Sequence, residues 1–106
     1  MTYTVRISDA LAETIAQEYG PEPSAPGQPS EWDFWSGPLA AALIGFRDFD
    51  RLLRSEIAEV RQLHLVDPVF GAVVFVGVLV APNTVEIAGC SVDPDYWDLI
   101  NDDPIA

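Results

Sequence analysis

The segment Ala72–Val80 (AVVFVGVLV) constrains the fold more than any other part of the chain, because it contains no polar side chain. The surrounding apolar stretch, Phe70–Pro82, is too short to span a bilayer and contains glycines, so it suits a buried strand. A strand that is apolar on both faces belongs in the middle of a sheet. We therefore predict that Ala72–Val80 is the central strand, flanked on both edges and shielded by helices.

Three further segments alternate polar and apolar residues, namely Thr2–Ile7, Glu59–Val66 and Thr84–Val92. A period of two is typical of a half-buried strand. Proline-containing turns separate the last two segments from the central strand. Gly89 stands inside the last segment and predicts a bulge or a close backbone approach.

Apolar residues at three- and four-residue spacing predict a first helix over Asp9–Tyr19. Ser8 or Asp9 can cap its start, because the side-chain oxygen satisfies a free amide of the first turn. Gly20, followed by a proline, ends it.

The same spacing predicts a second helix over roughly residues 38–55, with Ser36 as its cap and Pro38 in its first turn. Gly45 weakens this helix by about 1 kcal/mol relative to alanine. Asp93, followed by a proline, predicts a short third helix that ends at about Ile100.

Together these elements predict one α+β domain over residues 1–106, with the order β-α-α-β-β-β-α. Its small antiparallel sheet would carry two helices packed on one face. Residues 21–30 (PEPSAPGQPS) hold four prolines and predict a surface loop. The N-terminal segment alternates polar and apolar residues, so we expect no signal peptide. Cys90 is the single cysteine, which excludes a disulfide within the chain and favours a reducing, cytoplasmic compartment.

The charge balance narrows the class of partner. The chain has 17 acidic residues against five arginines and no lysine, which gives a formal charge of −12. Such a field repels nucleic-acid phosphates and anionic membranes, so we expect neither direct nucleic-acid binding nor membrane association. It favours a basic protein partner, although acidity also serves solubility alone. Homo-oligomer formation stays open.

Few residues suggest catalysis or metal binding. His64 is the only histidine, and Cys90 lacks a basic neighbour in sequence that would lower its pKa. A Cys90–His64 pair is conceivable, since the two residues fall on different strands of one sheet, but a structural or exposed His64 is favoured. Asp93 and Asp95 have the spacing of some metal ligands, but the sixth position of a calcium loop is Asp98 instead of glycine. We predict no catalytic residue, no metal site and no cofactor.

Two surface clusters are candidates for partner binding. Arg47, Arg51 and Arg54 lie at helical spacing and predict one basic helix face, which nearby acids can neutralise. The second cluster is aromatic and acidic: Glu31, Trp32, Asp33, Phe34 and Trp35. Tryptophans beside acids are typical interface anchors, although they also suit the open edge of a small core. Tyr96 and Trp97 pose the same alternative, and we favour the core for Trp97 and the interface for Trp32.

Two stretches of the chain, TYTVRISDALAETI and EVRQLHLVDPVFGAVVFVGVLVAPNTVEIAGCSV, resemble the RelE/ParE toxin superfamily of bacterial toxin–antitoxin systems in their order of elements. The resemblance implies a strand meander closing the fold. Ribosome-dependent members are basic and use arginine, lysine, histidine or tyrosine on the sheet and tail, whereas the tail here, DPDYWDLINDDPIA, has no basic residue. Only Arg61 and His64 could take these places, and no catalytic role is carried over to them. The resemblance therefore implies a member that has lost RNA cleavage or has acquired a protein target.

Three functions compete. The first is a non-enzymatic interaction module of bacterial type, either a degenerate RelE/ParE-like toxin–antitoxin component or an immunity-type inhibitor of a basic partner. The second is a RelE/ParE-like ribonuclease toxin with an atypical site. The third is an acidic mimic of nucleic acid. We favour the first, because it accounts for the acidity, the aromatic cluster and the missing catalytic set.

Overall fold

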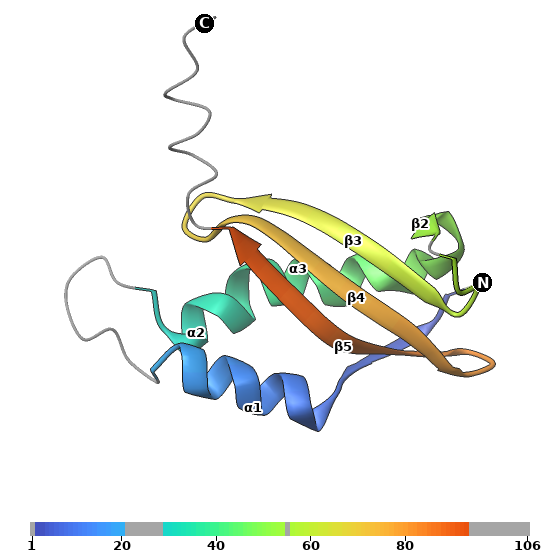
Figure 1. Cartoon of the computed structure of the whole chain (residues 1–106), viewed down its shortest axis with the longest axis horizontal. Helices are drawn as coiled ribbons and strands as arrows, with labels where there is room; N and C mark the ends of the chain where they lie inside the picture. The colour runs from blue at the N-terminus through green and yellow to red at the C-terminus, as the bar shows by residue number, and fades with distance from the viewer. Residues whose placement is uncertain (1, 21–28, 55, 94–106) are drawn as a thin grey trace, which may run out of the picture.

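The computed structural model of the chain describes residues 2–20, 29–54 and 56–93 (Figure 1). It is an α+β domain with a five-stranded sheet in the order β1-β5-β4-β3-β2. The strands are β1 (Thr4–Ile7), β2 (Leu53–Arg54), β3 (Val60–Asp67), β4 (Gly71–Ala81) and β5 (Thr84–Asp93). The helical elements are α1 (Asp9–Glu18), α2 (Glu31–Phe34), η1 (Trp35–Leu39), α3 (Ala40–Gly45) and η2 (Phe46–Arg51).

The prediction that Ala72–Val80 forms the central strand is confirmed. β4 lies between β3 and β5 and is antiparallel to both. The predicted bulge at Gly89 is also confirmed, since the β4–β5 register shifts between Val76 and Gly77, where their partners are Gly89 and Ile87. A glycine inside a strand tolerates this local disruption of the ladder.

The sheet is mixed, whereas the sequence predicted an antiparallel one. β1 pairs in parallel with the first half of β5, with Thr4 opposite Thr84 and Ile7 opposite Ile87. α1 then continues in the same general direction and lies beside the half of β5 that β1 leaves unpaired (Figure 1). Alternation within a segment predicts a strand, but it does not specify the neighbour with which that strand pairs.

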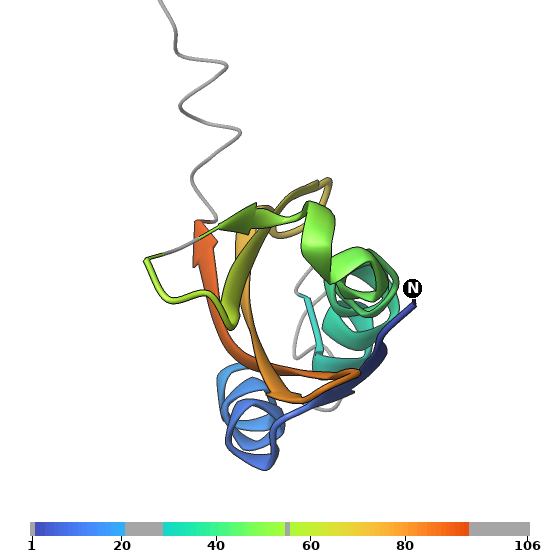
Figure 2. The same cartoon turned by 90° about the vertical axis from the view of Figure 1, so that its right-hand side faces the viewer.

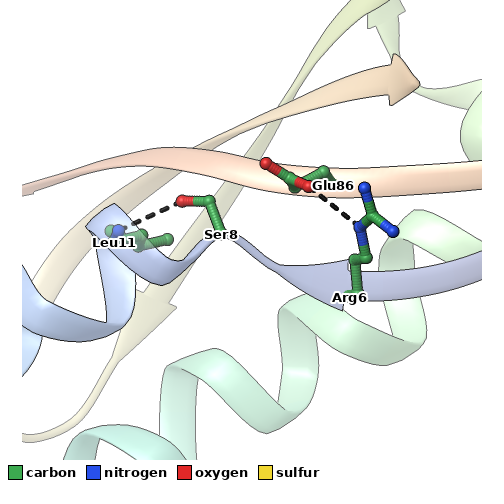
Figure 3. A network of polar contacts seen from close by, with 4 residues as sticks. All are labelled: Arg6, Ser8, Leu11 and Glu86. Carbon is green, nitrogen blue, oxygen red and sulfur yellow. Dashed lines mark hydrogen bonds and ion pairs between the residues drawn. The ribbon is translucent and has the colours of Figure 1, made fainter.

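The first helix agrees with its prediction, because the Ser8 hydroxyl accepts a hydrogen bond from the Leu11 amide at 3.1 Å (Figure 3). Figure 3 also shows the ion pair that joins β1 to β5, in which Arg6 Nε lies 2.8 Å from Glu86 Oε2. These two contacts fix the direction in which the chain leaves the sheet edge and enters α1.

The second helical segment starts earlier than the sequence predicted. Ser30, and not Ser36, is its cap: the Ser30 hydroxyl accepts from the Asp33 amide, and the Asp33 carboxylate accepts from the Ser30 amide. This reciprocal capping box satisfies two amides that a helix start otherwise leaves unpaired. Pro38 lies inside the π-helical turn η1, whose widened turn accommodates a residue without an amide hydrogen.

The same segment also ends earlier than predicted. The backbone of Asp48 departs from helical geometry (φ −100°, ψ 46°), and η2 ends at Arg51. The predicted helix of residues 38–55 therefore stops short, and Leu53–Arg54 forms the edge strand β2 against Gln62 and Arg61. Apolar spacing alone did not reveal this change from helix to strand.

The core lies on one face of the sheet, between the strands and the helices, and Figure 2 shows the sheet curving beside α3. Alternate residues of β4, namely Gly71, Val73, Phe75 and Gly77, are buried on this inner face. The core residues from the helices are Leu11, Ile15, Phe34, Leu39, Ala42, Phe46 and Phe49. The other face of β4 carries a row of partly exposed valines, which ends at Val80 with 46% of its surface exposed.

Two glycines allow the second helical segment to approach the sheet closely. A Cβ atom at Gly77 would lie 2.4 Å from Cε1 of Phe46, and a Cβ atom at Gly45 would lie 2.9 Å from Cδ2 of Leu63. Both distances are shorter than any tolerable carbon–carbon contact. At Gly45 the close neighbour is the flexible end of the Leu63 side chain, whereas at Gly77 it is the Phe46 ring.

We predict that Gly77→Ala lowers the free energy of unfolding by about 1–3 kcal/mol, because the added methyl group would overlap the Phe46 ring. The matched control is Gly89→Ala, since a Cβ atom there would meet Val76 Cβ at an ordinary 3.7 Å. Urea unfolding of both variants measures the difference. Equal loss in the two variants would contradict the close approach of Phe46.

Candidate functional site

The aromatic cluster predicted as a partner-binding site divides between core and surface. Trp32 is 70% exposed and Trp35 is 36% exposed, so both remain available to a partner. Phe34 is only 1% exposed, and we therefore correct its assignment from partner binding to the core. The four residues Trp32–Trp35 span about one helical turn and so cannot all point outward, and Phe34 occupies the inward position.

The two acids of the cluster also have local roles. The carboxylate of Asp33 is engaged by the Ser30 amide at 2.9 Å and by the Ser30 hydroxyl at 3.1 Å. The amide of Glu31 donates to the Gly20 carbonyl at 2.8 Å, which ties the start of α2 to the end of α1. Both carboxylates stand in the first turn of α2, where the helix dipole favours negative charge.

The predicted basic helix face is not formed. Arg47 and Arg51 are exposed on η2, but Arg54 lies on β2, opposite Arg61. Because the helix ends before Arg54, the three guanidinium groups do not share one helical face. The prediction failed because it extended the helical spacing beyond the kink at Asp48.

Arg61 and His64 lie on opposite faces of β3. Arg61 is 7% exposed on the inner face, and its guanidinium carbon lies 4.9 Å from the centroid of the Phe49 ring. Its Nη1 donates to the carbonyls of Ala58 and Val60. His64 is exposed and faces outward beside Gln62, whose Oε1 lies 3.1 Å from Nε2 of His64. These contacts give Arg61 a structural role and keep the two side chains apart.

His64 and Cys90 also lie on opposite faces of the sheet. His64 is opposite Val74 on the outer face, whereas Cys90 is opposite the buried Phe75. Burial raises the pKa of the Cys90 thiol to about 11, so the thiol is protonated at neutral pH. Cys90 therefore does not have His64 as a base, and its thiol lacks the ionisation that a nucleophilic cysteine requires.

Cys90 lines a hollow that the sequence did not reveal, which we call the α1–β5 hollow. Its volume is about 210 Å³, and it is lined by Leu11, Thr14, Ile15, Glu18, Tyr19, Phe34, Cys90 and Val92. The first four of these follow each other at helical spacing along α1, and the strand residues come from the end of β5. Helical spacing of this kind predicts residues that pack in the core. Only the structure shows that these residues line an open hollow.

A second hollow adjoins the first and shares Glu18, Tyr19 and Val92 with it. It extends towards Val69 and Phe70 in the β3–β4 turn. Burial raises the pKa of Tyr19, as it does for Cys90. Glu18 is exposed, and among the described residues that line either hollow it is the only charged one.

The arginines lie away from these hollows. Arg6 is opposite Glu86 near the start of β5, and Arg61 is opposite Gly77, which in turn is opposite Ile87. Arg54 lies opposite Arg61 in the β2–β3 register. The backbone carbonyl of Arg47 accepts a hydrogen bond from the Tyr3 amide beside β1, and Arg51 is the last residue of η2. The hollows lie instead at Cys90 and Val92, near the end of β5. Each charged residue described at this end of the sheet is acidic: Glu18, Glu31, Asp33, Asp67 and Asp93.

Several predicted features lie outside the described residues. These are most of the loop 21–30, the third helix through Ile100, and the side chains Asp95, Tyr96, Trp97 and Asp98. Within residues 2–20, 29–54 and 56–93, no group of three or more histidine, cysteine or acidic side chains could hold a metal ion. No helix in these ranges is long and apolar enough to cross a bilayer.

We predict that alkylation of Cys90 by iodoacetamide accelerates with pH and reaches half its maximum near pH 11, because the shielded thiol loses its proton only there. The urea-unfolded chain serves as the control and should reach half its maximum near the ordinary pKa of 9.0. Since the pKa is higher in the folded state, this thiol stabilises the fold fully below pH 9 and progressively less as the pH rises towards 11. A folded-state midpoint at or below pH 9 would contradict the burial of Cys90.

Comparison of the chain with protein-family models, with curated proteins and with solved structures gives no match. The candidate function therefore depends on the geometry described above.

Proposed function

We propose that this chain is a non-enzymatic interaction module of bacterial type that binds a basic protein in the cytoplasm. The observation that carries the proposal is the pair of exposed tryptophans, Trp32 and Trp35, on a capped helix at the acidic end of the sheet. Exposed tryptophan is rare on a surface that contacts only water, and it is enriched among residues that dominate binding energy.

The charge of the chain supports a basic partner. The formal charge is −12, and the acids near α2 have no arginine beside them in the described part of the sheet end. An attractive field of this kind accelerates association with a positively charged surface and rejects acidic competitors. The same field repels a nucleic-acid backbone.

The module would be either a degenerate RelE/ParE-like toxin–antitoxin component, as the element order predicted from the sequence suggests, or an immunity-type inhibitor. A ribonuclease of this type would need Arg61 and His64 at one site. Their opposite orientations on β3 and the structural contacts of Arg61 favour the binding role instead.

We predict that Trp32→Ala and Trp35→Ala each weaken binding of the basic partner by about tenfold or more, without unfolding the domain, because the two rings are exposed anchors. The experiment captures partners from lysate of the source cell, identifies them by mass spectrometry, and titrates the most enriched protein against each variant.

Ile57→Ala is the matched control, because Ile57 is 59% exposed and lies between η2 and β3, away from α2. It should retain full affinity. If all three variants bind equally, or if the captured proteins are acidic, the proposed function is wrong.

A further inference from the structure

The strongest unassigned feature is the α1–β5 hollow, which is an apolar recess with one carboxylate at its edge. Its floor contains Phe34 and Ile15, whose exposed fractions are 1% and 3%, and Cys90 and Val92 form the strand side. Glu18 is exposed and also borders the adjoining hollow. Apolar recesses with a few placed polar groups are typical binding sites.

We propose that the α1–β5 hollow receives a large apolar side chain of the basic partner, and that a lysine or arginine next to this side chain pairs with Glu18. This inference rests on the proposed function and names the chemistry that the partner presents. It adds a second contact to the surface formed by Trp32 and Trp35.

The size of the hollow fits one apolar side chain. Its volume is about 210 Å³, whereas an apolar cavity of roughly 150 Å³ already accommodates benzene. Leucine, phenylalanine or methionine therefore fits. Burial of such a side chain strengthens binding by roughly 10- to 150-fold through the hydrophobic effect.

The negative charge of Glu18 favours a cationic residue next to the partner's apolar side chain. Glu18 stands in the last turn of α1, which contains no basic residue, so its carboxylate adds to the negative end of the helix dipole. The strand register places Arg6, Arg54 and Arg61 level with the first half of β5, and Arg47 and Arg51 lie on η2. All five are therefore away from Cys90 and Val92. A second copy of this chain would bring another formal charge of −12 and is repelled.

The hollow also lies next to the tryptophan surface. The Glu31 amide donates to the Gly20 carbonyl, so α2 starts where α1 ends, and Phe34 of α2 lines the hollow from within the core. Figure 1 shows α2 beside this end of α1. The helix that carries Trp32 and the hollow therefore lie at the same end of the molecule.

Three small phenyl probes that differ in charge test this inference: 2-phenylethylammonium, 2-phenylethanol and 3-phenylpropionate. Each is titrated into the full chain and followed by NMR at the methyl groups of Leu11, Ile15 and Val92. We expect the cation to bind about two- to fivefold more tightly than the alcohol, in line with the usual strength of an exposed ion pair, and the anion to bind most weakly. Equal affinity for all three, or no shift at these methyl groups, would overturn the inference.

Two variant pairs locate the effect. Glu18→Gln should remove the preference for the cation, whereas Glu13→Gln, on the same helix but lining neither hollow, should keep it. Thr14→Trp should place an indole in the opening and abolish probe binding, whereas Gln17→Trp, also exposed on α1, should not. Probe binding that survives Thr14→Trp contradicts this location.

The same indole variants separate this inference from the proposed function. If Thr14→Trp leaves partner affinity unchanged while Trp32→Ala weakens it, the hollow is not used and the interaction module still stands. If Thr14→Trp weakens partner binding at least tenfold and Gln17→Trp does not, the hollow is part of the interface. If Trp32→Ala, Trp35→Ala and Thr14→Trp all leave partner affinity unchanged, both proposals fail.

Discussion

The burial of Phe34 among three other aromatic rings organises the end of the molecule that we assign to binding. Its ring centroid lies 5.3 Å from Tyr19 of the α1 C-terminus, 5.2 Å from Phe70 of the β3–β4 turn and 6.0 Å from Phe75 of the central strand. These separations are typical of favourable aromatic pairs. The cluster thereby joins a helix end, a turn and a strand that are far apart in the sequence, and it fixes the rotation of α2.

That rotation explains why the neighbours of Phe34 are exposed. Because Phe34 points into the core, Trp32 must point away from it. Accordingly, Phe34 is 1% exposed and Trp32 is 70% exposed. The same ring closes the inner end of the α1–β5 hollow. The tryptophan surface and the hollow are thus two consequences of one packing arrangement, which is why we treat them as parts of a single interface.

The sequence predicted the fold where local pattern and tertiary environment agree. β4 is central because nothing polar interrupts it, and α1 begins at Ser8 because a serine precedes a regular apolar stripe. The prediction failed where long-range contacts decide the outcome. The parallel pairing of β1 and the edge strand after Arg51 each depend on neighbours that are distant in the sequence.

The candidate site was predictable only in part, for the same reason. Trp32 and Trp35 were recognised as candidate anchors from their composition, but their separation from Phe34 required the helix phase, which follows from the Ser30–Asp33 capping box. That box has a serine followed three residues later by an acid, a signal that the sequence contained and that the choice of Ser36 overlooked. The hollow has no sequence signal, because a recess arises from how α1 sits beside β5.

The most direct measurement of the central claim compares the unfolding free energies of Phe34→Ala and Trp32→Ala in urea. Removing a fully buried phenylalanine should cost about 3–5 kcal/mol, whereas removing an exposed tryptophan should change stability by no more than about 0.5 kcal/mol. This outcome would show that Phe34 faces the core and Trp32 faces outward. A larger loss for Trp32→Ala than for Phe34→Ala would mean that α2 is rotated differently, and the proposed interface would then not exist.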